Sequence, residues 1–500
     1  MRLAVLFLRN SRKTDSPRGG QSGSSSLGLG PRSAACALLR NPRKTERGTG
    51  RFLARLVVRA APFALLISAL GIPAIFGADT IKLAEPFRSL SDLAAAAPPE
   101  FSAEALLRMV ESGKLADKNS RRDLIEKAFQ LASSAKFAVR MEGVPGTTTD
   151  TASGSLGQAY GLRLDVLSLQ SRAVEDMLPL DPSKARDLFG QMVKPALAPL
   201  TCDDALVYEP SEFYRALSAV VNGGFTPKEK AKEEHINLLL ESLAQTTSPS
   251  QLAPLARAVE NTGVTAVQQQ ILWVRFNGLL ESMQPDARSF SASLPALSDL
   301  STPGTQAALE KYRQKNHGCE IDSAQSSTAA SSGAQQSAAK SGTPKLDRYW
   351  QSANAQQLLQ AGKKLRFVSS TQLLTEADRA TPEWQQQLAD YLNLIADWTA
   401  DQEASPTVYY HERCLVYTGL LDLVAPGPQS DKILADYVDF IGNSGLYQQS
   451  PAEWFVEPHA LLDRSLTNPA QHSKILEAYQ NSGNPVLALA VALEKTFSAK

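Results

Sequence analysis

The feature that most constrains this chain is a four-residue signal that recurs where helices are predicted to start. Each copy has a small polar residue, then Pro, then Glu or Gln at the fourth position. The polar side chain caps the first turn, Pro lacks an N–H that this turn leaves unpaired anyway, and Glu or Gln bonds back to the cap. The copies are Thr226–Glu229, Ser248–Gln251, Ser450–Glu453 and Asn468–Gln471, with looser forms at Asp181, Thr381 and Ser405. The recurrence predicts many short, separately capped helices.

Apolar residues follow these starts with helical spacing. After Thr381, one face would carry Trp384, Leu388, Tyr391, Leu392, Ile395 and Trp398. An i, i+3, i+4 pattern of this kind is typical of amphipathic helices. Gly445 and Gly483, each in an Asn-Ser-Gly triplet, are predicted helix stops because glycine readily adopts the left-handed conformation. Strand signals are scarce, and the best one, Leu162–Val166, also fits a helix, so we expect an all-α protein with no sheet of three or more strands.

A short internal repeat suggests how the helices are arranged. Lys432–Tyr437 (KILADY) recurs as Lys474–Tyr479 (KILEAY), and each copy runs into an Asn-Ser-Gly stop. Paired helices with a period near forty residues resemble an α-solenoid of the TPR or HEAT type. The alternative is chance similarity of two six-residue helical segments. The TPR signature is not present in order, so the resemblance concerns architecture alone: helical hairpins stacked as an α-solenoid-like array.

Composition divides the chain into five parts. Residues 1–50 are rich in Ser, Gly and Arg without periodicity, which predicts a disordered head, either a mis-assigned start or a basic cytoplasmic tail. Residues 321–344 are a low-complexity Ser/Ala/Gln segment, predicted to be a flexible linker. This linker separates an N-terminal helical region, 86–320, from a C-terminal helical region, 345–500.

Residues 51–78 have the layout of an export signal. Arg51, Arg55 and Arg59 lead into an uncharged, mostly apolar run over 60–78 that ends in small residues. The predicted cleavage site after Ala78 is poor because bulky Phe76 stands at −3, so a retained single-span anchor is the alternative. Either way the body is expected outside the cytoplasm, periplasmic or extracellular. Membrane contact is expected only through 60–78, if that segment is not cleaved.

Charge and cysteine usage limit the partners of this body. Residues 1–78 hold 13 of the 51 basic and 2 of the 51 acidic residues, so 79–500 keep 38 basic and 49 acidic, net −11 with histidine neutral. An acidic body argues against nucleic acid as partner. Cys202 and Cys319 lie in polar, loop-like contexts and are a candidate disulfide pair, whereas Cys414 falls on an apolar helical face.

Motifs that could carry chemistry are incomplete. Ser133-x-x-Lys136 has the spacing of a nucleophile and its base, but the same tetrad occurs within the linker and its companion boxes are absent. His411-Glu412 lacks the second histidine of a zinc-protease helix, so His411 is interpreted as a surface or helix-packing residue. The acidic group near Cys202 lacks the alternating ligands of a calcium loop and comprises Asp203, Asp204, Glu209 and Glu212. We therefore predict no catalytic residue, cofactor or metal site.

Four of the five tryptophans lie in the C-terminal region, at 350, 384, 398 and 454. They could line a groove for sugars or peptides, but at helical spacing we expect core packing. The first hypothesis is an exported, non-enzymatic helical-repeat scaffold that binds a protein or peptide in the cell envelope. The alternative is a helical-toroid enzyme acting on envelope or extracellular polysaccharide through a carboxylate pair beside an aromatic groove.

Overall fold

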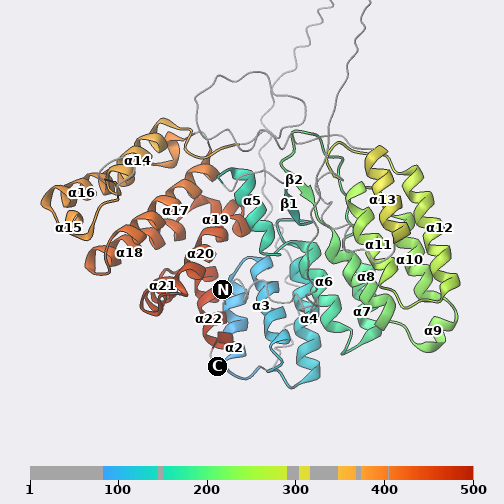
Figure 1. Ribbon diagram of the computed structural model, residues 1–500. Coiled ribbons are helices and arrows are strands. Elements are labelled where there is room, and N and C mark those ends of the chain that lie inside the picture. The colour runs from blue at the N-terminus through green and yellow to red at the C-terminus, as the bar shows by residue number, and fades with distance from the viewer. Residues whose placement is uncertain are drawn as a thin grey trace, which may run out of the picture. The chain divides into compact units, whose positions relative to one another are not determined.

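The computed structural model describes residues 83–144, 150–289, 303–315, 347–367, 373–403 and 405–498, all within one compact unit. Most of this described chain is helical (Figure 1), which confirms the all-α prediction. The predicted head, export segment and linker, at 1–50, 51–78 and 321–344, lie outside the described residues.

The N-terminal region begins with helices that follow one another closely and includes one short pair of strands. Its elements are α2 (Phe87–Ala96), α3 (Pro99–Glu111), α4 (Lys118–Ala132), β1 (Met141–Gly143), α5 (Ala152–Gly161), α6 (Val166–Met177), α7 (Pro182–Gln191), β2 (Leu206–Tyr208), α8 (Ser211–Gly223), α9 (Pro227–Ala231), α10 (Glu234–Ala244), η1 (Pro249–Gln251), α11 (Leu252–Glu260), α12 (Ala266–Ser282) and α13 (Pro303–Lys315). The strands pair antiparallel, with Met141 opposite Tyr208, and form the one sheet in the described part of the chain.

The C-terminal region contains helices alone apart from isolated bridges. Its elements are α14 (Ala353–Lys364), α15 (Glu376–Arg379), α16 (Pro382–Asp397), η3 (Ala400–Gln402), α17 (Pro406–Leu423), α18 (Pro428–Gly442), α19 (Gly445–Gln449), α20 (Pro451–Ser465), α21 (Pro469–Asn481) and α22 (Pro485–Ser498). The two copies of the internal repeat lie in α18 and α21, which pack against each other. Tyr437 and Tyr479 occupy the same position of the two copies, and both are fully buried.

Most of the predicted helix starts are present. Thr226 and Glu229 form the reciprocal capping box of α9, and Gln251 accepts from the Ser248 amide at 2.9 Å. The side chains of Asp181, Thr381, Ser405 and Asn468 each accept from an amide of the first turn. Ser450 differs from the prediction: it also terminates α19, and its side chain caps no amide of α20. Ser450 instead joins the two helices through its backbone: its N–H donates to the Leu446 carbonyl at 2.8 Å and its carbonyl accepts from the Trp454 N–H at 2.9 Å.

Two predicted boundaries need correction. Gly483 does close α21 in the left-handed conformation, with φ of +73°, but Gly445 opens α19 instead of ending α18. Leu162–Val166 forms neither a strand nor a continuous helix. Arg163 takes a positive φ of 57° there, which turns the chain between α5 and α6.

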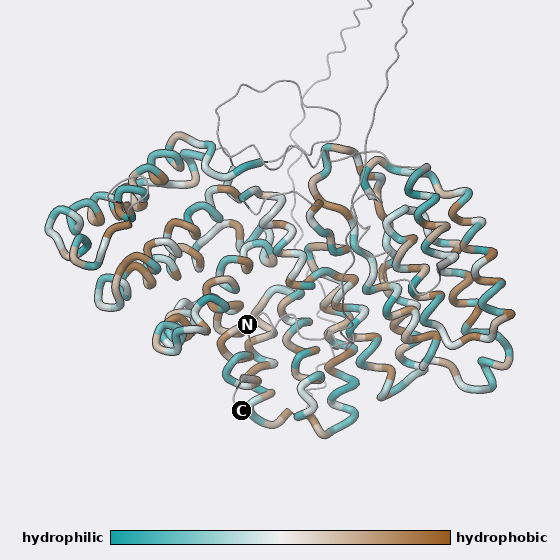
Figure 2. Tube along the Cα trace, in the orientation of Figure 1, coloured by the Kyte–Doolittle hydropathy of each residue, from teal (hydrophilic) through white to brown (hydrophobic). Residues whose placement is uncertain are grey.

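Amphipathic helix faces build a core that both regions share. Figure 2 shows apolar and polar residues alternating along the helices. α5 packs on α20, and α2 packs on α22, so helices from opposite ends of the described chain lie side by side (Figure 1). At this junction the rings of Phe101 and Phe455 meet edge to face, 5.1 Å apart. The division into 86–320 and 345–500 stays a prediction, but helices of the two ranges bury apolar surface against each other.

Candidate functional site

A groove of about 890 Å³ lies between α16, α17, α18 and α19. We call it the aromatic groove, because buried aromatic side chains form its floor. Its principal residues are Asn393 and Ala396 of α16, Tyr409, Arg413 and Tyr417 of α17, Lys432, Asp436, Asp439 and Phe440 of α18, and Leu446 and Gln449 of α19. The groove offers apolar surface at its floor and charged groups on its walls, which is the usual make-up of a ligand-binding cleft.

The spacing of residues along α17 explains the floor. Tyr409, Arg413 and Tyr417 are four residues apart, so they line one face of the helix. Phe440 of α18 lies over this face, with its ring centre 6.0 Å from those of Tyr409 and of Tyr417. Trp398 supports the floor from below at 4.9 Å from Tyr409, edge to face. The aromatic packing fixes the angle at which α17 and α18 meet and leaves the groove open beside it.

Arg413 lies at the centre of this floor. Its guanidinium carbon is 4.7 Å from the ring centre of Phe440 and 5.8 Å from those of Tyr409 and Tyr417. Nη1 donates to the carbonyl oxygen of Trp398 at 2.5 Å and to the hydroxyl of Tyr409. Nη2 makes one long contact, 3.5 Å, with the hydroxyl of Tyr417. Every partner of this cation within the described ranges is therefore neutral.

Arg413 keeps its charge in this position. Partial burial on its own would lower the pKa of Arg413, but hydrogen bonds from the guanidinium to Tyr417 and Tyr409 raise the pKa overall. The rings beneath it favour a cation, because their faces are electron-rich. The floor thus presents a fixed positive charge on an aromatic surface.

Exposed charges line the wall formed by α18. Lys432, Asp436 and Asp439 all lie on the groove side of this helix and are solvent-exposed. The side-chain amide of Asn443 donates to Asp439 at 2.8 Å. Both carboxylates belong to one wall, so they do not face each other across the groove.

His411, singled out in the sequence, lies in the core instead of a metal site. Its side chain is 0 % exposed, and Nδ1 is 2.8 Å from Glu457 of α20 while Nε2 is 3.8 Å from Glu453. Burial would lower the pKa of His411, but the nearby carboxylates of Glu453 and Glu457 raise it overall. Tyr349 stacks on the imidazole, with ring centres 6.1 Å apart. His411 therefore ties α17 to α20 as a helix-packing residue.

The Ser133-x-x-Lys136 motif and the acidic group near Cys202 form no active site in the described residues. Ser133 ends α4 and accepts from Gln170 at 2.9 Å, without a contact to Lys136. Asp204 accepts from the Thr201 amide at 2.6 Å. No group of three or more potential metal ligands was found in the described ranges.

The structure describes two of the three cysteines of the body. Cys202 is disulfide-bonded, and Cys414 is a free, buried thiol. Residue 319 lies outside the described residues, so the pairing of Cys202 with Cys319 stays a prediction. In the part of the chain that the structure describes, no helix has the length and apolarity needed to cross a membrane.

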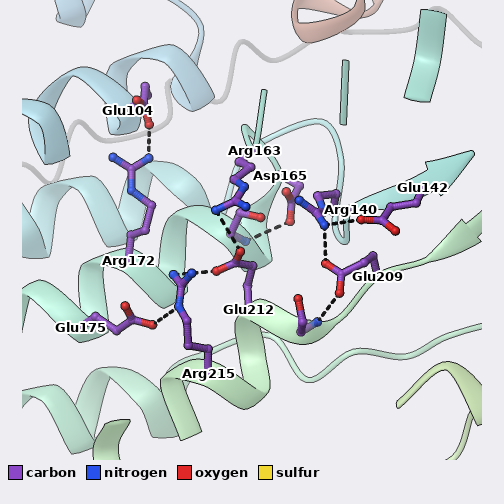
Figure 3. A network of polar contacts seen from close by, with 12 residues as sticks. Glu104, Arg140, Glu142, Arg163, Asp165, Arg172, Glu175, Glu209, Glu212 and Arg215 are labelled. Atoms are coloured by element: carbon purple, nitrogen blue, oxygen red, sulfur yellow. Dashed lines mark hydrogen bonds and ion pairs between the residues drawn. The ribbon is translucent and has the colours of Figure 1, made fainter. Parts of the chain in front are cut away.

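A second polar feature links α3, α6 and α8 with the two strands (Figure 3). Three of its arginines each meet two carboxylates, and Arg163 pairs with Glu212 at 3.2 Å. Arg172 pairs with Glu104 and Glu111, Arg215 with Glu175 and Glu212, and Arg140 with Glu142 and Glu209. Nearby Asp176 is an exception: burial, and then repulsion from Glu111, raise its pKa well above the usual range of a carboxyl. We call these residues the arginine network and interpret it as structural, because its charges compensate one another.

The comparisons with known proteins add no relative. No family model, no curated protein and no solved structure matches this chain. The site is therefore judged on its own chemistry.

Sequence reasoning missed the aromatic groove. It treated the residues after Ser405 as one apolar stripe and passed over Arg413, which lies midway between Tyr409 and Tyr417. That i, i+4, i+8 arrangement of two tyrosines around an arginine is visible in the sequence. Its pairing with Phe440 of the next helix is not.

Proposed function

We propose that this protein is an exported, non-enzymatic scaffold of stacked helical hairpins that binds a peptide or an extended protein segment in the aromatic groove. The observation that carries the proposal is Arg413, a charged side chain on an aromatic floor with no carboxylate partner in the described ranges. Aromatic residues and arginine are the side chains most enriched where proteins bind other proteins.

Further features support a peptide as the ligand. The groove is lined by residues of α16, η3, α17, α18 and α19, which together offer apolar and polar surface to a peptide chain. Its walls alternate amides and charges of both signs, and these can bond the polar backbone of a peptide. A disulfide at Cys202 is in keeping with the oxidising environment expected of an exported body.

The proposal is tested with the purified full-length chain and an immobilised library of random decapeptides. Ala396 is exposed and lines the groove, so Ala396→Trp fills the groove without removing a core residue. Ala470→Trp adds the same bulk at an exposed position of α21 and is the matched control. We expect the wild type and Ala470→Trp to retain a common set of decapeptides, and Ala396→Trp to lose them. Equal retention by Ala396→Trp, or no retained decapeptide, would contradict the proposal.

The alternative is an enzyme acting on envelope or extracellular polysaccharide, and one observation favours it. Asp436 and Asp439 line the same groove as the tyrosines, and glycosidases use paired carboxylates. Such pairs flank the bond that is cleaved, whereas these two acids share one wall. Release of reducing ends from envelope polysaccharide by the wild type, and its loss in Asp436→Asn or Asp439→Asn, would favour the enzyme.

A further inference from the structure

Arg413 is a charge that the fold does not neutralise. Arginine side chains removed from water are normally paired with carboxylates, because desolvation of a lone charge is unfavourable. In the arginine network, Arg172 meets the carboxylates of Glu104 and Glu111. Arg413 is half-buried and meets two hydroxyls and a carbonyl oxygen. Its position in the floor of a groove leaves room for an anion from outside.

The guanidinium is held ready for such an anion. Nη1 is fixed by the Trp398 carbonyl and the Tyr409 hydroxyl, and Phe440 covers one face of the plane. Nη2 is left with a single long contact to Tyr417. A group so constrained has little conformational entropy to lose when it binds, which favours affinity.

The charges on the wall favour a carboxylate over a phosphate. Asp436 and Asp439 outnumber Lys432 on the groove wall, so the wall would repel a dianion about twice as strongly as a monoanion. The Arg413 guanidinium carries one positive charge and has Nη2 available for a new partner. It therefore compensates a single negative charge. The monoanion that peptides carry is a carboxylate.

We propose that the aromatic groove recognises a carboxylate of its peptide ligand, and that this carboxylate pairs with Nη2 of Arg413. The inference rests on the proposed function, since it names the ligand chemistry of the same groove. The carboxylate comes from the end of the peptide or from an Asp or Glu side chain. These two sources present the same group to Arg413, and the experiment separates them.

The experiment compares four forms of one decapeptide that binds the full-length chain. They are the free acid, the C-terminal amide, the form with Asp and Glu replaced by Asn and Gln, and the form with both changes. Calorimetric titration gives the Kd of each. A hydrogen bond between charged partners corresponds to roughly a 10-fold or larger change in Kd. A loss of this size on amidation assigns the terminal carboxylate, and the same loss on side-chain replacement assigns a side chain.

Two arginine variants complete the test. Arg413→Gln should bind the free acid about 10-fold more weakly or worse and should no longer distinguish the four peptide forms. Arg88→Gln makes the same change at an exposed position of α2 and should bind as the wild type does. The comparison of peptide forms on the wild-type chain does not depend on the stability of any variant.

The outcomes separate this inference from the proposed function. If all four forms bind the wild type within about twofold of one another, peptide binding stands and the carboxylate inference is overturned. If the library yields no decapeptide that binds the wild type, both the proposed function and the carboxylate inference are overturned.

Discussion

The arginine network and the middle of α17 differ in how their buried and half-buried charges are compensated. Between α3 and α8, arginines such as Arg172 and Arg215 each meet two carboxylates (Figure 3). On α17 the adjacent residues Glu412 and Arg413 have no partner of opposite charge in the described part of the chain. Charges that compensate one another hold helices together. A charge without a partner of opposite sign does not hold helices together by pairing, so such charges indicate where to look for function.

Glu412 shows what an uncompensated charge does inside the fold. It is 1 % exposed, and one of its carboxylate oxygens accepts from the amide of Trp350, a residue in the left-handed conformation with φ of 62°. Burial, followed by repulsion from Glu403 and Asp347, raises the pKa of Glu412 to about 7. Glu412 therefore restrains an unfavourable turn through a hydrogen bond that favours the ionised carboxylate, while burial of the group favours the protonated form.

The largest loss of stability should come from removing an arginine of the arginine network in the N-terminal region. Arg172→Met leaves Glu104, whose side chain is 1 % exposed, facing Arg108 alone. We expect it to lower the free energy of unfolding by about 3–5 kcal/mol, because a buried carboxylate loses its main partner. Urea unfolding at pH 7 measures the loss. Adding Glu104→Gln to Arg172→Met should recover part of it, and a double variant no more stable than Arg172→Met would show that the charge is not the cause.

The next largest effect should be a gain of stability, and it should come from removing the charge of Glu412 in the C-terminal region. The pKa of Glu412 rises from 4.5 in the unfolded chain to about 7 in the folded one, so this group's stabilisation is complete below pH 4.5 and is lost as the pH rises to about 7. Glu412→Gln keeps the acceptor for Trp350 but cannot titrate. We expect the variant to match the wild type near pH 4 and to exceed its stability by roughly 2 kcal/mol at pH 8.

Urea unfolding at a series of pH values checks this prediction. His411, whose pKa is also raised, contributes to the pH dependence of both proteins and cancels in the difference. If the difference in stability between Glu412→Gln and the wild type were constant across pH 4–8, ionisation of Glu412 would not be its cause.

Substitutions of helix N-cap residues in the C-terminal region should change the free energy of unfolding by a smaller amount. Asn468 accepts from the amide of Gln471 at 3.3 Å, so Asn468→Ala should cost about 1 kcal/mol. The Ser450 side chain caps no amide, so Ser450→Ala should cost clearly less. Both are measured by urea unfolding of the full-length chain, because helices of the C-terminal region pack on α2 and α5. Equal costs would mean that Ser450 caps α20 in solution.

A small effect on stability should also come from Arg413 itself. Arg413→Met loses contacts with three rings but leaves no buried carboxylate behind. We expect a cost of about 0.5–1 kcal/mol, well below that of Arg172→Met. A cost as large as that of Arg172→Met would show that Arg413 serves the fold, and the contrast between the two regions would fail.

The sequence predicts local structure here better than it predicts the site. Caps at Asp181, Thr226 and Thr381 depend on neighbouring residues, and the structure confirms them. The burial of Trp384, Trp398 and Trp454 follows equally from helical spacing. The groove depends on Phe440 meeting Arg413 across two helices, and the burial of His411 depends on α20. Such contacts between helices cannot be read from periodicity, because they depend on how the helices are packed.

One measurement tests the central claim that the uncompensated charge marks the binding surface. Hydrogen exchange of the full-length chain would be followed by mass spectrometry with and without a saturating retained decapeptide. The account predicts slower exchange at the groove, in 393–402 and 440–450, and unchanged exchange at the arginine network, in 139–144 and 206–215. Slower exchange at the network with none at the groove would contradict it.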